Sequence, residues 1–143
     1  MKRLARILVP VDGSAGAERA VDLAAELAEA TESALDILYV SYFDCATDDQ
    51  GESWLPDSIA GPVGDQAQAA LERAQRHVPR GISVSCHHRM GIPADEILRF
   101  AANQPDDLIV VGGRGMGVVE GFLMGSVSQA VLERAVTSVI VAR

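Results

Sequence analysis

The feature that most constrains the fold of this chain is a regular alternation between two kinds of segment. Short apolar runs alternate with longer stretches in which apolar residues recur every three or four positions. The first kind is typical of buried strands, and the second is typical of helices that cover a sheet. Asp36 interrupts one run, which suggests that one face of that strand is less buried. The runs interpreted as strands lie at residues 6–11, 34–42, 82–87, 108–111 and 138–141.

The order of these segments predicts the fold class. Strands and helices follow one another in turn, and the helices are expected at about residues 14–29, 67–78, 93–103 and 126–135. Alternation at this spacing is typical of an α/β protein with an open five-stranded parallel sheet, helices on both faces and right-handed connections. Periodicity alone does not give the order of the strands within the sheet.

Length and charge exclude several classes of protein. A chain of 143 residues has room for one core of this kind, so residues 1–143 are interpreted as a single domain. The net charge of −8 argues against a nucleic-acid partner, because phosphate backbones bind clustered lysine and arginine. The apolar segment after the basic start is too short for a signal peptide. Because Cys45 and Cys86 form no spaced motif, we expect reduced thiols and a cytoplasmic location.

The least regular part of the sequence is residues 44–65. Its second half contains the turn formers Gly61, Pro62 and Gly64, which predict a long irregular loop, with a helix start near Asp57 as an alternative. A loop of this length in a compact domain is typical of a functional or mobile segment.

A glycine-rich segment follows the fourth apolar run and leads into a helix. Glycines let a backbone approach a ligand closely, and the amides of such a loop together with a helix N-terminus bind anions. Ligands of open parallel sheets bind beyond the carboxyl ends of strands, where Asp12 and Gly112 both fall. The sequence therefore predicts a phosphate site here. It contains neither the Gly-Lys-Ser/Thr of the common P-loop nor the dinucleotide-binding glycine spacing.

The spacing of these glycines resembles a known signature. Gly112, two residues, Gly115, nine residues and then Gly125-Ser126 resemble the ATP-binding motif of the universal stress protein family. The opening Ile-Leu-Val-Pro-Val-Asp-Gly-Ser (7–14), the segment Gly-Ile-Pro-Ala-Asp-Glu-Ile (91–97) and the closing Val-Ile-Val (139–141) are similar to the same family. The resemblance covers the chain apart from the irregular loop. It implies a Rossmann-like sheet with the strand order 3-2-1-4-5.

The resemblance also implies a ligand and the residues that bind it. The ligand would be ATP, or another adenine nucleotide such as AMP or ADP, accompanied by a divalent cation, Mg²⁺. Pro10, Val11, Asp12 and Val40 would line the adenine and ribose end of the site. The residues expected near the ribose and the phosphates are Val111, Gly112, Arg114, Gly115, Gly125, Ser126 and Val127.

Several of these residues also have an ordinary structural interpretation. The tripeptide that begins at Asp12 is a good turn and helix start on any fold. Ser126 and Gln129 have the spacing of a capping box, so Ser126 is expected to cap its helix whether or not phosphate binds. Arg114 either pairs with a phosphate or is simply solvated. His87 and His88 lack a third ligand at a suitable spacing, so no metal site is predicted.

The last strand predicts a partner. The resemblance places residues 138–142 at an edge of the sheet, yet this strand is apolar. An exposed apolar edge promotes aggregation unless something pairs with it, so we expect a two-fold homodimer through it.

The function that the family resemblance implies is that of an ATP-binding regulator in a stress response. The alternatives are a module that docks on a regulatory partner, such as the cytosolic face of a membrane transporter, and a slow ATPase or self-phosphorylating protein. No catalytic residues are predicted, because no general base is evident beside the glycine-rich segment.

Overall fold

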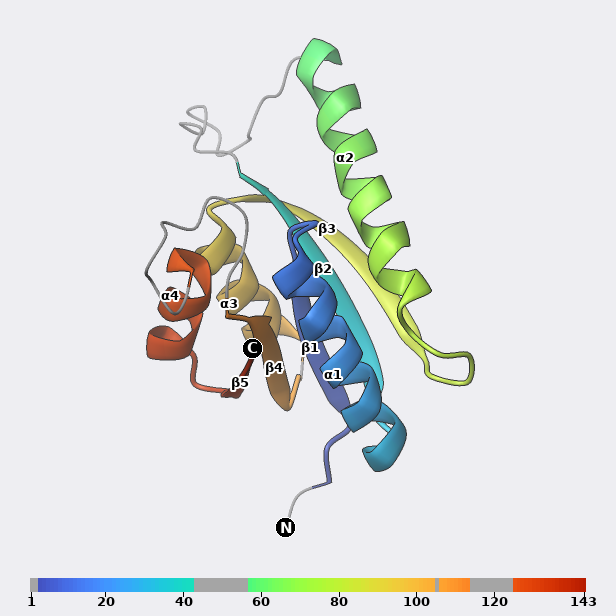
Figure 1. Cartoon of the computed structure of the whole chain (residues 1–143). Helices are drawn as coiled ribbons and strands as arrows, with labels where there is room; N and C mark the ends of the chain where they lie inside the picture. The colour runs from blue at the N-terminus through green and yellow to red at the C-terminus, as the bar shows by residue number, and fades with distance from the viewer. Residues whose placement is uncertain (1–2, 43–56, 105, 114–124) are drawn as a thin grey trace.

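Five parallel strands form one sheet with the spatial order β3-β2-β1-β4-β5 (Figure 1). The computed structural model describes residues 3–42, 57–104, 106–113 and 125–143, with side chains omitted for 57–63. The sequence predicted this fold class, and the family resemblance implied this strand order. The strands are β1 (Arg6–Val11), β2 (Ala34–Tyr42), β3 (Val84–Gly91), β4 (Leu108–Gly112) and β5 (Ser138–Ala142). The helices are α1 (Ala15–Thr31), α2 (Asp57–Arg76), α3 (Pro93–Asn103) and α4 (Ser126–Arg134).

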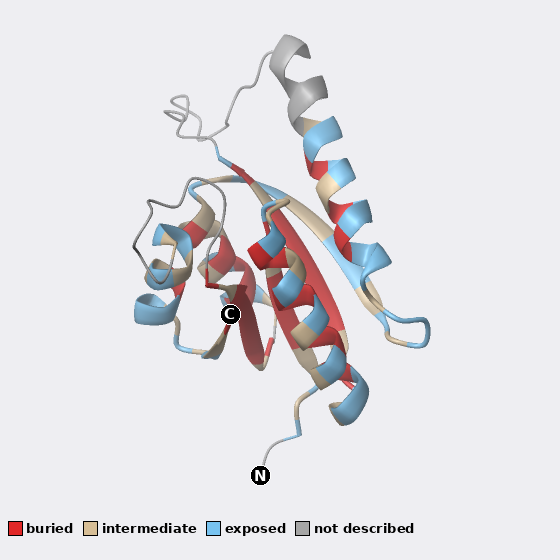
Figure 2. Cartoon of the chain, in the orientation of Figure 1, coloured by how far each residue is buried: buried red, intermediate tan, exposed pale blue. Residues whose placement is uncertain are grey.

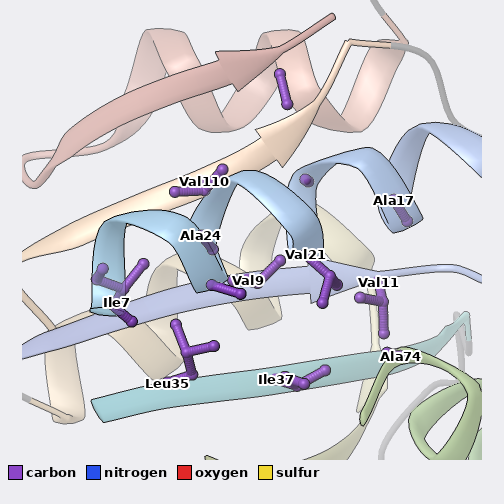
Figure 3. Packing of buried hydrophobic residues seen from close by; sticks show 14 of the residues in the cluster. Ile7, Val9, Val11, Ala17, Val21, Ala24, Leu35, Ile37, Ala74 and Val110 are labelled. Atoms are coloured by element: carbon purple, nitrogen blue, oxygen red, sulfur yellow. The ribbon is translucent and has the colours of Figure 1, made fainter. Parts of the chain in front are cut away.

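Both faces of the sheet are covered, α1 and α2 packing on one face and α3 and α4 on the other (Figures 1 and 2). Successive side chains of a strand point to opposite faces, so β1 contributes to two cores. Ile7, Val9 and Val11 pack beneath α1 and α2 (Figure 3). Leu8 packs on the other side with Ile97 and neighbouring side chains of α3 and α4. The central strand is therefore buried on both faces, as its continuous apolar run predicts.

Helix α2 corrects the predicted loop. The helix begins at Asp57, which confirms the alternative helix start, and it runs through Gly61, Pro62 and Gly64. The loop prediction is therefore wrong for residues 57–65. Helix propagation adds one hydrogen bond for each residue fixed, and this outweighs local turn signals once a helix is nucleated. The apolar face that begins at Ala67 packs on the sheet and supplies that nucleus. The rest of the predicted loop, including residues 44–56, lies outside the described residues. Within the described ranges, no helix is both long and apolar enough to cross a membrane.

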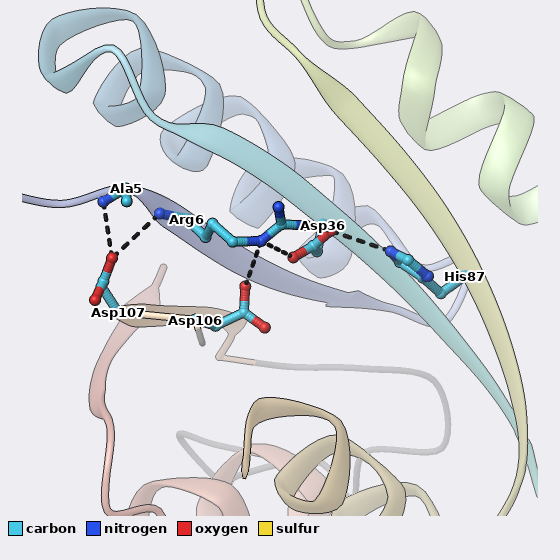
Figure 4. A network of polar contacts seen from close by, with 6 residues as sticks. All are labelled: Ala5, Arg6, Asp36, His87, Asp106 and Asp107. Atoms are coloured by element: carbon cyan, nitrogen blue, oxygen red, sulfur yellow. Dashed lines mark hydrogen bonds and ion pairs between the residues drawn. The ribbon is translucent and has the colours of Figure 1, made fainter. Parts of the chain in front are cut away.

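A polar network crosses the amino ends of the strands (Figure 4). Asp36 is fully buried, so the expectation of a less buried face at this residue is wrong. Arg6 donates to its carboxylate through Nε at 3.0 Å and Nη2 at 2.5 Å, and His87 Nε2 lies 3.0 Å from it. Burial opposes the charge of Asp36, but the Arg6 hydrogen bonds hold the pKa of this carboxyl below its ordinary value. A buried carboxylate is tolerated because its partners satisfy it.

Asp106 is the second buried carboxyl of this network. It lies 3.9 Å from Arg6 Nε, and burial together with the nearby charge of Asp36 raises the pKa of Asp106 to about 8. Two adjacent carboxyls do not both ionise easily, so Asp106 holds its proton at neutral pH. Its neighbour Asp107 accepts from the backbone amides of Ala5 at 2.8 Å and Arg6 at 3.3 Å, which fastens the start of β4 to β1.

Candidate functional site

The switch point of the sheet lies between β1 and β4. These strands are paired in register only at Ile7 with Leu108 and at Leu8 with Ile109. Both strands continue for three residues beyond Leu8 and Ile109, to Val11 and Gly112. The chain then leaves β1 for α1 on one face, and the next helix after β4, α4, covers the opposite face. Ligands of open α/β sheets bind at such a point.

Asp12, Gly13 and Ser14 build the turn that leaves β1. Gly13 has a positive φ of 84°, which favours glycine. Asp12 Oδ1 accepts from the Ser14 amide at 2.9 Å, and Ser14 Oγ accepts from the Ala17 amide at 3.2 Å. The predicted turn and helix start are therefore confirmed, with Ser14 as the N-cap of α1. The side chain of Asp12 is exposed at the carboxyl edge of the sheet.

Gly112 is required by packing. A Cβ atom at this position would lie 2.7 Å from both the carbonyl carbon and the carbonyl oxygen of Gly16. Gly16 is in the first turn of α1, so glycine at 112 lets this helix sit directly against the end of β4. The first glycine of the predicted signature thus has a structural role that does not depend on any ligand.

Hydrogen bonds hold the start of α4 beside the end of β4. The Gly113 amide donates to the carbonyl of Ala142 in β5 at 2.8 Å, and the Gly125 amide donates to the carbonyl of Gly113 at 2.7 Å. The Ser128 hydroxyl donates to the carbonyl of Gly112. The last two contacts bring the two ends of the glycine-rich segment together, and the first joins the end of β4 to β5. Arg114 and Gly115 lie between those ends and fall outside the described residues.

The N-terminus of α4 differs from the predicted capping box. Gly125 is the N-cap and Ser126 is the first helical residue, so the N-cap of this helix has no side chain that could cap it. The capping prediction is wrong because a capping hydroxyl belongs to the N-cap residue. Ser126 is one position after the N-cap and lies within the helix. The first turn also contains no acidic residue, unlike the first turns of α1 and α3. Ser126 and Val127 are exposed there.

This helix end is suited to an anion. The first amides of a helix have no partner within the helix, and they carry a partial positive charge. At α1 the Ser14 hydroxyl satisfies one of these amides, whereas the N-cap of α4 is a glycine and has no side chain to do so. The exposed Ser126 hydroxyl lies at the same helix end. A phosphate here would accept hydrogen bonds from backbone amides and from this hydroxyl.

The other predicted contacts divide between the two faces. Val40 and Val111 belong to the α3 and α4 side of the sheet, and Pro10, two positions after Leu8, faces the same side. Val11 belongs to the opposite core, beneath α1 and α2. Val11 and Val111 are buried, so a ligand at this edge would meet their backbone more readily than their side chains.

The sequence analysis missed three residues at this edge. Tyr42 and Ile92 are exposed apolar residues at the end of β2 and before α3, with 69% and 43% of their surface accessible. Ser128 anchors α4 to β4. A large aromatic residue at the last position of a strand was the available signal for Tyr42. Nothing local in the sequence shows that the Ser128 hydroxyl reaches the end of a distant strand.

This fold and this edge define a doubly wound α/β protein with an anion-receptive helix end at its switch point. The profile of the universal stress protein family matches residues 4–143. The chain belongs to that family.

Relatives share nearly the full length of the chain. A universal stress protein of Bacillus subtilis, YxiE, is 31% identical over 145 residues, which covers 96% of this chain and 98% of that protein. The solved structure of universal stress protein UspA from Lactobacillus plantarum is 26% identical and covers 100% of both chains with a TM-score of 0.79. A universal stress protein solved in complex with cAMP is 26% identical, with a TM-score of 0.69 and coverage of 98% of this chain and 97% of that chain.

Proposed function

We propose that this chain is an ATP-binding regulator that acts in a stress response. The observation that carries the proposal is the uncapped N-terminus of α4, which is held at the switch point by the Gly125–Gly113 hydrogen bond. The phosphates lie against the backbone amides of Ser126 and Val127, and the nucleoside extends across the ends of β1 and β2. The related protein that binds cAMP supports an adenine nucleotide as the ligand.

Mg²⁺ accompanies the phosphates in this proposal. In nucleotide sites this ion is bound chiefly by phosphate oxygens and water, with few protein ligands. That chemistry fits a chain in which no three metal-ligating side chains cluster among the described residues. In this proposal Asp12, which is exposed at the same edge, contacts the ribose or the water shell of the ion.

The proposed assembly is a homodimer through β5. This strand is at one edge of the sheet, and Val139, Ile140 and Val141 are only partly buried. Val136, in the turn that precedes the strand, is fully exposed. Pairing of two such edges would bury both rows of side chains. Sedimentation at micromolar concentration should give twice the mass of one chain, and a single-chain mass would contradict the dimer.

The first test is the nucleotide content of the purified protein. The protein is prepared without added nucleotide and denatured, and the released compounds are identified by chromatography and mass spectrometry. We expect adenine nucleotide. If none is released, titration with Mg²⁺ and ATP decides, and an absence of binding there would refute the proposal in favour of a partner-docking module.

Two glycine substitutions then locate the site. Gly125→Leu places a side chain at the mouth of the α4 N-terminus and should abolish ATP binding. Gly64→Leu, in α2, is the matched control because a Cβ atom there meets nothing within 4 Å. Equal binding by Gly125→Leu and the unmodified protein would show that the phosphates lie elsewhere.

A further inference from the structure

We propose that the carboxylate of Glu96 accepts a hydrogen bond from the exocyclic amino group of adenine. It thereby selects adenine over the oxo-purines guanine and hypoxanthine. This inference rests on the proposed nucleotide site and adds to it the residue that chooses the base.

Apolar residues lie at the proposed base end of the site, where Tyr42 and Ile92 are exposed and Val40 is partly buried. We call these three residues, which lie at the ends of β2 and β3, the base shelf. Val40 and Tyr42 are two positions apart on β2 and point to the same face, toward α3. A nucleotide whose phosphates lie at α4 extends its base from β4 past β1 toward β2, because this is the strand order. Exposed aromatic and apolar surfaces of this kind bind bases by stacking.

Glu96 reaches this shelf from α3. Gly91 pairs in register with Tyr42 on the neighbouring strand. A Cβ atom on Gly91 would lie 2.8 Å from both Cγ and Oε1 of Glu96. The carboxylate therefore occupies the space that a side chain at position 91 would fill. Since Gly91 is in register with Tyr42, the Glu96 carboxylate lies at the end of the sheet that carries Tyr42.

The environment of Glu96 leaves it able to accept another hydrogen bond. Only 13% of its side chain is exposed, and Arg99 Nη1 donates to Oε1 at 2.5 Å. Arg99 approaches from the solvent side, with 65% of its side chain exposed. A carboxylate has two oxygens and about four acceptor sites, so one ion pair does not saturate it.

The chemistry of the purine ring decides what this charge selects. Adenine presents an amino group at position 6, whereas guanine presents an oxygen acceptor there. A carboxylate accepts from the amino group and repels the oxygen. Arg89 is the cation on β3 that pairs in register with Val40. Its guanidinium lies 5.5 Å from the centre of the Phe100 ring and donates to the carbonyl of His88 at 3.0 Å, so other groups already hold it.

Calorimetric titration with ATP and with inosine triphosphate tests the inference. Inosine carries an oxygen at position 6 and a proton on N1, while its sugar and phosphates are those of ATP. The comparison therefore changes only the Watson–Crick edge of the base, which includes the amino group that Glu96 would contact. We expect the unmodified protein to prefer ATP by about tenfold or more. Glu96→Gln, whose amide both donates and accepts, should bind the two nucleotides within about threefold of each other.

Two controls separate base selection from a structural role. Arg99→Ala removes the exposed partner but keeps the carboxylate, and it should retain the preference for ATP. Glu72→Gln removes the same charge from α2 and should also retain the preference for ATP.

Equal binding of both nucleotides by the unmodified protein, or an undiminished preference in Glu96→Gln, would overturn the role of Glu96 while ATP binding stands. Absence of binding by either nucleotide would overturn the proposed site and this inference with it. The comparison in the unmodified protein needs no substitution. Equal binding of the two nucleotides there would therefore refute the role of Glu96 even if Glu96→Gln fails to fold.

Discussion

Replacement of Gly112 by alanine tests whether this glycine serves packing. The new Cβ would lie 2.7 Å from the carbonyl carbon and oxygen of Gly16 and 3.2 Å from the amide nitrogen of Ala17. These atoms are backbone within the first turn of α1, so no flexible side chain can move aside. The helix would have to shift away from β4, which would disturb the packing of the Asp12–Ser14 turn as well.

The magnitude follows from two opposing effects. Inserting a methyl group into a well-packed contact costs about 1–3 kcal/mol. Alanine also reduces the entropy of the unfolded chain, which returns about 0.4–1 kcal/mol. At the middle of both ranges, the net loss of unfolding free energy is about 1.3 kcal/mol, or about 4 °C in Tm for a domain of this size.

Urea denaturation followed by circular dichroism, without nucleotide, measures this loss. Gly64→Ala is the matched control, since a Cβ there meets nothing within 4 Å and the residue is inside α2. That substitution should raise stability by about 1 kcal/mol. If Gly112→Ala is as stable as the unmodified protein but loses ATP binding, the packing argument is refuted and Gly112 serves the ligand alone.

Two further predictions concern the buried polar network. Asp106 keeps its proton in the folded protein up to about pH 8 but loses it near pH 4 when unfolded, so the unfolded state binds fewer protons between these values. The unfolding free energy should therefore fall as pH rises through this window, by at most about 1.4 kcal/mol per pH unit, and Asp106→Asn should flatten the dependence in urea titrations. A slope unchanged in Asp106→Asn would contradict this assignment. Asp36→Ala removes a fully buried carboxylate from Arg6 and should cost about 3–5 kcal/mol in the same assay. Asp22→Ala, at an exposed pair with His77, should cost less than about 1 kcal/mol, and equal losses would show that burial is not the deciding factor.

Much of the fold could be predicted from the sequence because the signals are local. The continuous apolar run at 6–11 and the three-to-four-residue period of α1 reflect burial that repeats along the chain. Ser14 caps its helix because an N-cap needs only a hydroxyl and amides two or three residues away. Local signals failed at α2, where Pro62 and Gly64 predicted a loop but packing of the later turns holds a helix.

The same difference between local signals and long-range packing applies to the candidate site. The glycine spacing and the family resemblance predicted a site at the carboxyl edge of the sheet, and Asp12 and the start of α4 do lie at that edge. They could not show that Gly112 accommodates the backbone of α1, because Gly16 is distant in sequence and approaches only when both elements pack on the sheet.

The sequence by itself determined the alternation of strands and helices, and with it the fold class, since hydrophobic periodicity reports which face of each element is buried. Only the tertiary structure decided which side chains of different strands and helices contact one another. Asp36 appears in the sequence as an interruption of an apolar run, but in the fold it is the centre of a network supplied by β1, β3 and the start of β4. Glu96 appears as an ordinary helix residue, but in the fold its carboxylate lies against Gly91, the residue in register with Tyr42. These contacts depend on the register and packing of segments that are distant in the sequence. Such long-range contacts produce no periodic pattern in the sequence.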